Sequence, residues 1–229
     1  DAAIVASPPD SHYSQCLLLA ARGIPTLVEK PPARSALEMR DLVFAFSKAG
    51  VPLAVGYQLR ATPALQEIRR RGWSGEIGDT RLAVAEFGYD IEKWRKSPAS
   101  YKEPLISESS HDLDLCCWFF GPLTHLTGHI QHSERGPVVL SPYFHNSRVL
   151  CSVILDGFSP NYRRSFTIYG TEGSLRWDFN LVENDAAYRA ELEAFLGAAS
   201  GSQRADCEGW EVLETMVMIE YASQLPVLG

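Results

Sequence analysis

The first 57 residues alternate short apolar runs with helical patterns, and this alternation constrains the fold more than any other feature of the sequence. Apolar runs at residues 2–6, 26–29 and 52–57 are separated by segments with helical periodicity. Short apolar runs of this kind are typical of parallel strands that are buried on both faces. Parallel strands need a crossover connection, which is right-handed in nearly all proteins. The pattern therefore predicts a β-α-β-α-β unit with a parallel sheet.

Capping residues set the bounds of the two helices in this unit. Asp10 or Ser11 can cap the first helix, which Gly23 would end. The second helix opens with Ser35-Ala36-Leu37-Glu38, the pattern of a capping box, and Gly50 would end it. Both helices are therefore expected to fill the connections between the strands.

Beyond residue 60 the pattern changes to strand-like segments in series. These segments lie at residues 80–87, 123–131, 148–155, 165–169 and 174–178. Helices are predicted at residues 63–72, 108–120, 184–196 and 206–222. Turns such as Asp156-Gly157 suit an antiparallel meander. We therefore expect an α/β domain at residues 1–60, followed by an α+β domain at residues 61–229 with an open, mostly antiparallel sheet.

The composition excludes several classes of protein. With 45% apolar and 21% charged residues, the 229-residue chain is ordinary for a soluble globular protein. Its net charge is -7 and its longest basic run is Arg69-Arg70-Arg71, which argues against nucleic-acid and anionic-membrane partners. No apolar run approaches the roughly 20 residues that span a bilayer, and no basic-then-apolar leader opens the sequence. We expect a cytoplasmic protein.

Cysteine and histidine spacing gives little support for a metal site. The five cysteines are odd in number and lack CxxC spacing, so buried, reduced thiols are expected. His125 and His129 would share one face of a strand, whereas His132 would lie on the other. We therefore predict no bound metal.

A charged pair ends the second apolar run, in the stretch Thr26-Leu27-Val28-Glu29-Lys30-Pro31-Pro32. An ionised pair at the carboxyl end of a buried strand packs poorly, and α/β proteins bind ligands at that edge of the sheet. A strand end with surface charges before a proline turn would produce the same stretch. With these seven residues alone, the two interpretations are balanced.

A second polar cluster opens the helix predicted at residues 108–120. Helical spacing places Glu108, His111 and Asp114 along one stripe. A carboxylate that orients an imidazole is the arrangement that a general acid or base needs. A helix start rich in serine and acidic residues for capping reasons would look the same, and the spacing alone slightly favours that interpretation.

Six short motifs occur in one order along the chain. They are Ala6-Ser7-Pro8-Pro9 with His12, Val28 to Pro31, Gly56 to Arg60 with Pro63, Ser110 to Asp114, Tyr169 to Leu175, and Tyr188 to Leu192 with Phe195. Together they resemble the glucose-fructose oxidoreductase and inositol dehydrogenase (Gfo/Idh/MocA) family. The resemblance implies a partial Rossmann parallel sheet before the α+β domain. It also implies an NAD or NADP cofactor, and hydride transfer to or from a sugar, cyclitol or related hydroxy compound.

The same resemblance implies roles for individual residues. Lys30 would hydrogen-bond the hydroxyl being oxidised, and His111 would take or return its proton. Glu108 would orient His111, although many members place an aspartate one residue earlier, at the position of Ser107. The Lys30-Pro31 bond is expected to be cis. The expected cofactor contacts are Ser7, Pro8, Pro9, His12, Glu29, Lys30, Pro31, Arg60, Trp94 and Arg95.

The sequence lacks a Gly-rich turn after a first strand, and it resembles the family from the fourth strand onward. Two hypotheses remain: an oxidoreductase whose N-terminal part is missing here, and a shortened, non-catalytic module for dimerisation or binding. Without the usual pyrophosphate cradle, we expect this chain alone to bind NAD or NADP no tighter than roughly millimolar. Its open first strand suggests low solubility. The family resemblance implies a homodimer or homotetramer assembled through the C-terminal sheet.

Overall fold

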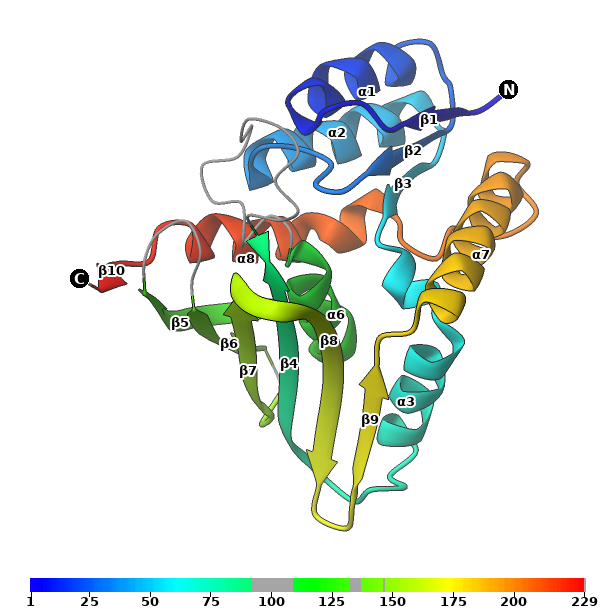
Figure 1. The fold of residues 1–229 in the computed structure, drawn as a ribbon. Coiled ribbons are helices and arrows are strands. Elements are labelled where there is room, and N and C mark those ends of the chain that lie inside the picture. Colours follow the sequence, from blue (N-terminus) through cyan, green and yellow to red (C-terminus); the bar gives the residue numbers. More distant parts are fainter. Residues whose placement is uncertain (92–108, 132–136, 146, 229) are drawn as a thin grey trace. The chain divides into compact units, whose positions relative to one another are not determined.

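The computed structural model describes residues 1–91, 109–131, 137–145 and 147–228 (Figure 1). The chain divides into two compact units. The first contains residues 1–62 and 182–217, and the second contains residues 63–181 and 218–229. Residues 182–217 thus group with the first unit, and our division into domains 1–60 and 61–229 remains a proposal.

A three-stranded parallel sheet forms the centre of the first unit, in the order β1-β2-β3. The strands are β1 (Ala3–Val5), β2 (Thr26–Glu29) and β3 (Leu53–Gly56). The short 3-10 helix η1 (Pro9–Ser11) and the helices α1 (His12–Ala20) and α2 (Ala36–Ala49) fill the crossovers. The predicted β-α-β-α-β unit is therefore confirmed.

Local capping chemistry determines where α2 begins and ends. The Ser35 Oγ accepts a hydrogen bond from the backbone N–H of Glu38 at 3.1 Å, and Gly50 ends the helix with a positive φ of 68°. The Glu38 carboxylate accepts from the backbone N–H of Arg34 rather than from that of Ser35. Only one half of the predicted capping box therefore forms.

The first strand is less buried than its sequence predicted. In β1 only Val5 is buried, and the side chain of Ile4 is 59% exposed. Within the described sheet β1 pairs with β2 alone. The prediction that residues 2–6 are buried on both faces is wrong for this chain, because an edge strand with an uncovered face leaves alternate side chains open to water.

Residues from late in the sequence complete the core of the first unit. Phe195, from α7 (Leu181–Ala199), and Ala205 pack against Leu27 and Ala54 of the sheet. The backbone N–H of Val55 donates to the carbonyl of Cys207 at 3.1 Å. The chain continues through η3 (Gly209–Val212) and α8 (Leu213–Ala222). The edge of β3 that does not pair with β2 is thus contacted by the segment around Cys207.

The second unit is built on a seven-stranded sheet in the order β10-β5-β6-β7-β4-β8-β9. The strands are β4 (Thr80–Asp90), β5 (Leu123–Gln131), β6 (Val138–Phe144), β7 (Leu150–Asp156), β8 (Phe158–Gly170), β9 (Ser174–Asp178) and β10 (Val227–Leu228). Neighbours are antiparallel except for the parallel pairs β4–β7 and β10–β5. The mostly antiparallel sheet is confirmed.

The predicted meander is wrong. β4, the earliest strand of this sheet in the sequence, lies between β7 and β8. Insertion of an early strand between two later ones depends on contacts between distant segments, which the periodicity of each segment does not report. The sequence also gave no prediction for β6, in which Ser141-Pro142 interrupts the apolar pattern.

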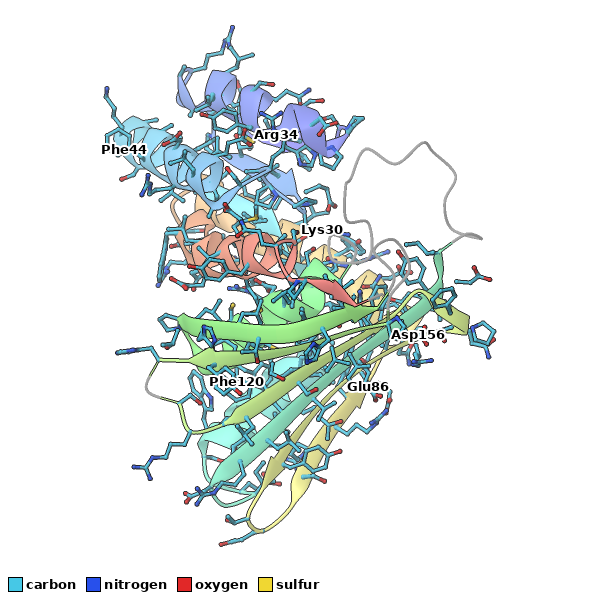
Figure 2. All side chains as sticks on the ribbon, turned by 90° about the vertical axis from the view of Figure 1, so that its left-hand side faces the viewer. Lys30, Arg34, Phe44, Glu86, Phe120 and Asp156 are labelled. Atoms are coloured by element: carbon cyan, nitrogen blue, oxygen red, sulfur yellow. The ribbon has the colours of Figure 1, made fainter. Side chains whose placement is uncertain are left out.

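Helices cover one face of this sheet. The helix α6 (Ser110–Phe120) packs against β4, β6 and β7, and α3 (Pro63–Trp73), which follows the 3-10 helix η2 (Gln58–Ala61), packs against β9. The opposite face, where Glu86 is labelled, is seen in Figure 2. It carries exposed apolar side chains, namely those of Val139, Tyr143, Leu150 and Tyr169.

Candidate active site

The carboxyl ends of the three parallel strands carry most of the residues predicted to bind a cofactor. In register, Val5 lies opposite Val28 and Glu29 lies opposite Gly56, so the three strands end together. The loop of residues 6–11 follows β1, and we call it the β1 loop. The loop of residues 30–35 follows β2, and we call it the β2 loop. These two loops form the polar edge at which parallel sheets bind ligands.

Glu29 and Gly56 fit against each other at this edge. The Glu29 Oε2 accepts a hydrogen bond from the backbone N–H of Lys30 at 3.2 Å. A Cβ atom added to Gly56 would lie 3.1 Å from that oxygen and 3.4 Å from the Cα of Glu29. Gly56 therefore leaves the space in which the Glu29 carboxylate sits, and its own backbone does not have a positive φ.

Lys30 begins the β2 loop and is half-buried. The Lys30–Pro31 peptide bond is cis, as expected. Pro31, Pro32 and Ala33 are all buried. The lysine is thus attached to a backbone that is packed on both sides, by β2 before it and by the buried residues after it.

His12 lies between the β1 loop and the β2 loop. Its side chain is 1% exposed. The Nδ1 atom lies 2.9 Å from the carbonyl oxygen of Pro31, and the Nε2 atom lies 2.7 Å from the carbonyl oxygen of Ser7. The Ser7 hydroxyl in turn donates to the Gln15 side chain at 2.8 Å. The first turns of α1 therefore hold both loops.

Arg60 lies in η2 and is 2% exposed. Its guanidinium group is 3.8 Å from the carboxylate of Glu211 in η3. The neighbouring Gln58 donates to the side chain of Asn184 at 3.3 Å. Arg60 therefore binds another part of the first unit.

His111 is the second residue of α6 in the second unit. The backbone N–H groups of Asp112 and Leu113 both donate to the carbonyl of Ser109, which closes the first turn. His111 is 5% exposed and Asp114 is 1% exposed. Their spacing places the two side chains on one side of the helix, as predicted. The predicted partner Glu108 and the predicted cofactor contacts Trp94 and Arg95 lie outside the described residues.

Arg164, which was not predicted as a site residue, pairs with Asp112, the residue after His111. Arg164 lies on β8, and its Nη2 atom is 3.2 Å from the Oδ2 of Asp112. Both side chains are buried, and the guanidinium carbon lies 4.0 Å from the ring centroid of Phe87. One signal was available: Phe166 and Ile168 alternate toward the core, and the same alternation places Arg164 on the inward face.

The thiols of this chain are poorly suited to nucleophilic chemistry. All five cysteines are buried and reduced, as predicted. Burial raises the pKa of the Cys16 thiol to about 12. A hydrogen bond with Cys151, together with burial, raises the pKa of Cys116 well above its ordinary value. Because the thiolate is the reactive form, these two groups remain protonated and inert at neutral pH.

The described residues can be considered for metal binding and for membrane insertion. They contain no group of three or more His, Cys, Asp or Glu side chains placed to hold a metal ion, and His132 lies outside them. Among the helices of the described part of the chain, none is long and apolar enough to cross a membrane.

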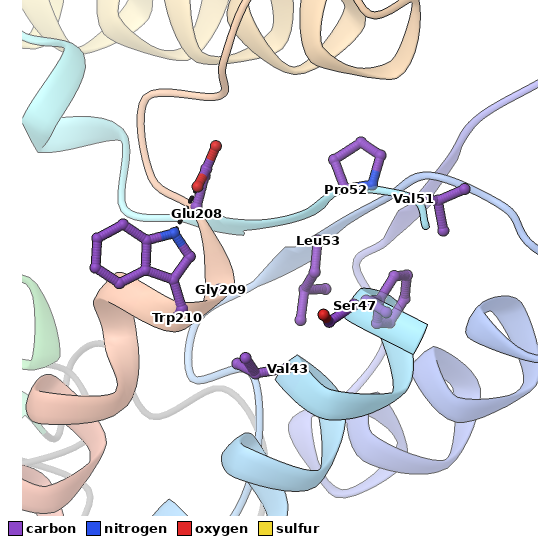
Figure 3. A pocket seen from close by; sticks show the side chains of 9 residues that line it. Val43, Ser47, Val51, Pro52, Leu53, Glu208, Gly209 and Trp210 are labelled. Atoms are coloured by element: carbon purple, nitrogen blue, oxygen red, sulfur yellow. Dashed lines mark hydrogen bonds between the residues drawn. The ribbon is translucent and has the colours of Figure 1, made fainter. Parts of the chain in front are cut away.

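A pocket of about 400 Å³ lies elsewhere in the first unit (Figure 3). Its walls are mostly apolar and include Val43, Leu53 and Trp210. The indole N–H of Trp210 donates to the carboxylate of Glu208. The pocket contains none of the residues that the sequence analysis placed in the active site.

Comparison with known proteins gives two matches in order along the chain. Residues 1–57 match a family model described as an oxidoreductase family with an NAD-binding Rossmann fold. Residues 65–176 match the GFO/IDH/MocA C-terminal domain. The first unit thus carries an NAD-binding Rossmann pattern, and the second carries the C-terminal domain of the same group of proteins.

Individual relatives are similar over most of this chain. The chain is 26% identical to D-apiose dehydrogenase of Paraburkholderia graminis over 82% of its own length and 52% of that protein. It is 26% identical to the rhizopine catabolism protein MocA of Rhizobium meliloti over 98% of its length and 75% of that protein. The chain therefore spans about half the length of the first relative.

A solved structure supports the fold. The WlbA dehydrogenase from Bordetella pertussis, in complex with NADH and UDP-GlcNAcA, superposes with a TM-score of 0.81 at 20% identity. The superposition covers 97% of this chain and 77% of that chain. At this level of identity the likeness concerns the fold alone, a parallel sheet followed by a mostly antiparallel sheet.

Proposed function

The chain belongs to the Gfo/Idh/MocA family of oxidoreductases, and we propose that it functions as an NAD(P)-dependent dehydrogenase of a sugar, cyclitol or related hydroxy compound. The observation that carries the proposal is the edge of the parallel sheet, where Glu29 and Lys30 end β2 beside Gly56. The rest of β2 is buried and free of charge, whereas the acidic and the basic side chain at its end are both half-buried.

The residues at this edge fit the nicotinamide end of a dinucleotide. The Glu29 carboxylate is an acceptor for ribose hydroxyls, and a side chain at position 56 would crowd it, with its Cβ 3.1 Å from the Oε2. Ser7, Pro8, Pro9, Lys30 and Pro31 lie in the two loops that flank it. We propose these residues, with Glu29, as contacts of the cofactor, and His12, which the family resemblance also assigns to this site, as a residue that supports the two loops. Arg60, Trp94 and Arg95 complete the proposed set, although the pairing of Arg60 with Glu211 favours an indirect role for that arginine.

In the proposed chemistry the cofactor transfers the hydride and the protein positions and transfers the proton. When bound, the nicotinamide accepts or supplies the hydride. The ammonium group of Lys30 hydrogen-bonds the substrate hydroxyl and fixes its orientation. His111 takes the hydroxyl proton during oxidation and returns it during reduction, with Glu108 orienting its ring. The relatives named D-apiose dehydrogenase and inositol 2-dehydrogenase support a polyhydroxy substrate.

A substrate panel tests this function. We expect the purified natural protein to reduce NAD or NADP with at least one pentose, hexose or cyclitol, because Lys30 would orient the reacting hydroxyl and His111 would take its proton. The measurement is the absorbance of the reduced nicotinamide, with each cofactor and in both reaction directions. A protein that binds the cofactor but turns over no compound of the panel would favour the non-catalytic module instead.

We also propose that the protein forms a homodimer or homotetramer through the exposed face of the seven-stranded sheet. That face carries the apolar side chains of Val139, Tyr143, Leu150 and Tyr169, which are between 40% and 60% exposed. Val84 lies on the same face in the middle of β4, opposite Ser152 on one side and Thr167 on the other. A sheet face of this kind suits a two-fold contact, in which each residue meets its counterpart.

Replacing Val84 with arginine is therefore expected to dissociate the oligomer, because a two-fold contact buries the new charge twice without a partner. Sedimentation at micromolar concentration should give a dimer or tetramer for the wild type and a monomer for the variant. Val182→Arg, at a position that is 78% exposed at the start of α7, is the matched control. A wild-type monomer at this concentration would contradict the proposal.

A further inference from the structure

His12 contacts both loops of the proposed cofactor site through their backbones. Its ring nitrogens lie 2.9 Å from the Pro31 carbonyl oxygen and 2.7 Å from the Ser7 carbonyl oxygen. One carbonyl belongs to the β1 loop and the other to the β2 loop. A side chain that is 1% exposed, with both nitrogens facing carbonyls, is badly placed to bind a cofactor directly.

The two contacts make a specific chemical demand. Carbonyl oxygens only accept hydrogen bonds, so each contact requires a hydrogen on the ring nitrogen that faces it. A neutral imidazole carries one N–H group, so it donates to one of the two carbonyls, and its tautomer decides which. A phenyl ring of similar shape would fill the same space without satisfying either carbonyl.

The support for the β1 loop does not rest on His12 alone. Gln15, one turn further along α1, accepts a hydrogen bond from the Ser7 hydroxyl at 2.8 Å. Ser7 is thus held at its carbonyl by His12 and at its side chain by Gln15. The β2 loop has its contact with this helix at Pro31, directly after Lys30. A change at His12 therefore acts on the position of Lys30 through one peptide unit.

We propose that His12 is a positioning residue that fixes the β1 loop and the β2 loop to each other and so places Ser7 and Lys30 for the nicotinamide. The catalytic consequence of this inference rests on the proposed function. The two contacts of His12 with the loops, which we call the clasp, belong to the first unit alone. His12 thus has a role through the backbone in place of direct contact with the cofactor.

Two substitutions separate the hydrogen bonds from the shape of the ring. His12→Phe keeps the approximate volume and removes both ring nitrogens, whereas His12→Gln keeps an amide group with two N–H bonds. In the natural protein we expect His12→Phe to raise the dissociation constant for NAD or NADP and to lower kcat, each by about tenfold to a hundredfold, the scale of a displacement near 1 Å. His12→Gln should recover part of both. Tyr13→Phe is the control: Tyr13 lies next to His12 in α1, and its hydroxyl makes only a weak contact with Asp41 of α2. This variant should have the cofactor affinity and kcat of the wild type.

Hydrogen-exchange rates of backbone N–H groups in the two loops test the clasp without requiring enzymatic activity. The backbone N–H of Lys30 donates to Glu29, and that of Ser11 donates to the Pro8 carbonyl. Both should exchange faster in His12→Phe, while the N–H of Thr26, which donates to the Pro52 carbonyl inside the sheet, should keep its rate. Nitrogen NMR of the wild-type imidazole should show that a ring nitrogen donates a hydrogen bond, and this measurement needs no variant to fold.

The outcomes distinguish the clasp from the proposed function. Faster exchange in His12→Phe of a protein without dehydrogenase activity would retain the clasp and reject the function. A His12→Phe protein with wild-type cofactor affinity, kcat and exchange rates would reject the clasp. Lost cofactor affinity with unchanged exchange, without recovery in His12→Gln, would indicate direct contact and would also overturn the proposal. A wild-type imidazole that donates no hydrogen bond from either nitrogen would overturn it as well.

Discussion

Replacing Lys30 with methionine is expected to lower the turnover of the natural protein by about a hundredfold or more, the usual scale for a positioned proton-transfer group. Methionine keeps an unbranched apolar stem of similar length, so the packing around β2 should persist. It removes the ammonium group that we propose to hold the substrate hydroxyl. Cofactor affinity should change little, because the other proposed contacts in the two loops are retained.

Steady-state kinetics and cofactor titration measure the two effects separately. Lys48→Met is the matched control, since Lys48 lies exposed in the last turn of α2, away from both loops. That variant should retain wild-type kcat and cofactor affinity. Near-wild-type turnover in Lys30→Met would reduce Lys30 to a structural residue and would remove the main support for the proposed mechanism.

Replacing Arg164 with methionine is expected to lower the free energy of unfolding by about 3–5 kcal/mol, the cost of removing one member of a buried ion pair. Asp112 is 1% exposed, and its carboxylate lies 3.2 Å from the guanidinium group. The variant also loses the stacking of that group on Phe87. Because native proteins are stable by only about 5–15 kcal/mol, this single change would remove a large part of the stability of the second unit.

Urea denaturation of three variants tests this explanation. Arg163→Met is the matched control, because Arg163 pairs with Asp156 near the surface, and exposed pairs contribute about 0–1 kcal/mol. The double variant Arg164→Met with Asp112→Leu should regain most of the stability, since apolar replacement of a buried ion pair is often neutral. If Arg164→Met costs no more than Arg163→Met, the buried pair does not hold the first turn of α6.

Several parts of the fold could be read from short stretches of sequence. The bounds of β2, the cap at Ser35 and the end of α2 at Gly50 were all predicted, because each depends on residues within a few positions of one another. The alternation of buried and exposed side chains likewise revealed most strands of the second sheet. Family motifs then added the cis bond before Pro31, which no periodicity would indicate.

The candidate site was predicted as a set of residue types but not as a set of contacts. Glu29, Lys30 and His111 stood out because charged or titratable groups are unusual where they occur. The packing of Gly56 against the Glu29 carboxylate, and the position of His12 between two carbonyls, involve atoms from separate strands and loops. Nothing local to either residue reports such an approach.

The sequence by itself determined the local elements, the parallel unit at the start and the family to which the chain belongs. Only the tertiary structure decided that β4 lies between β7 and β8, that Arg164 neutralises Asp112, and that Arg60 pairs with Glu211. Helix caps and periodicity arise from interactions between near neighbours, so a short segment encodes them completely. Strand order and buried ion pairs are settled by which distant segments bury the most apolar surface while leaving no charge alone, and that balance belongs to the whole fold.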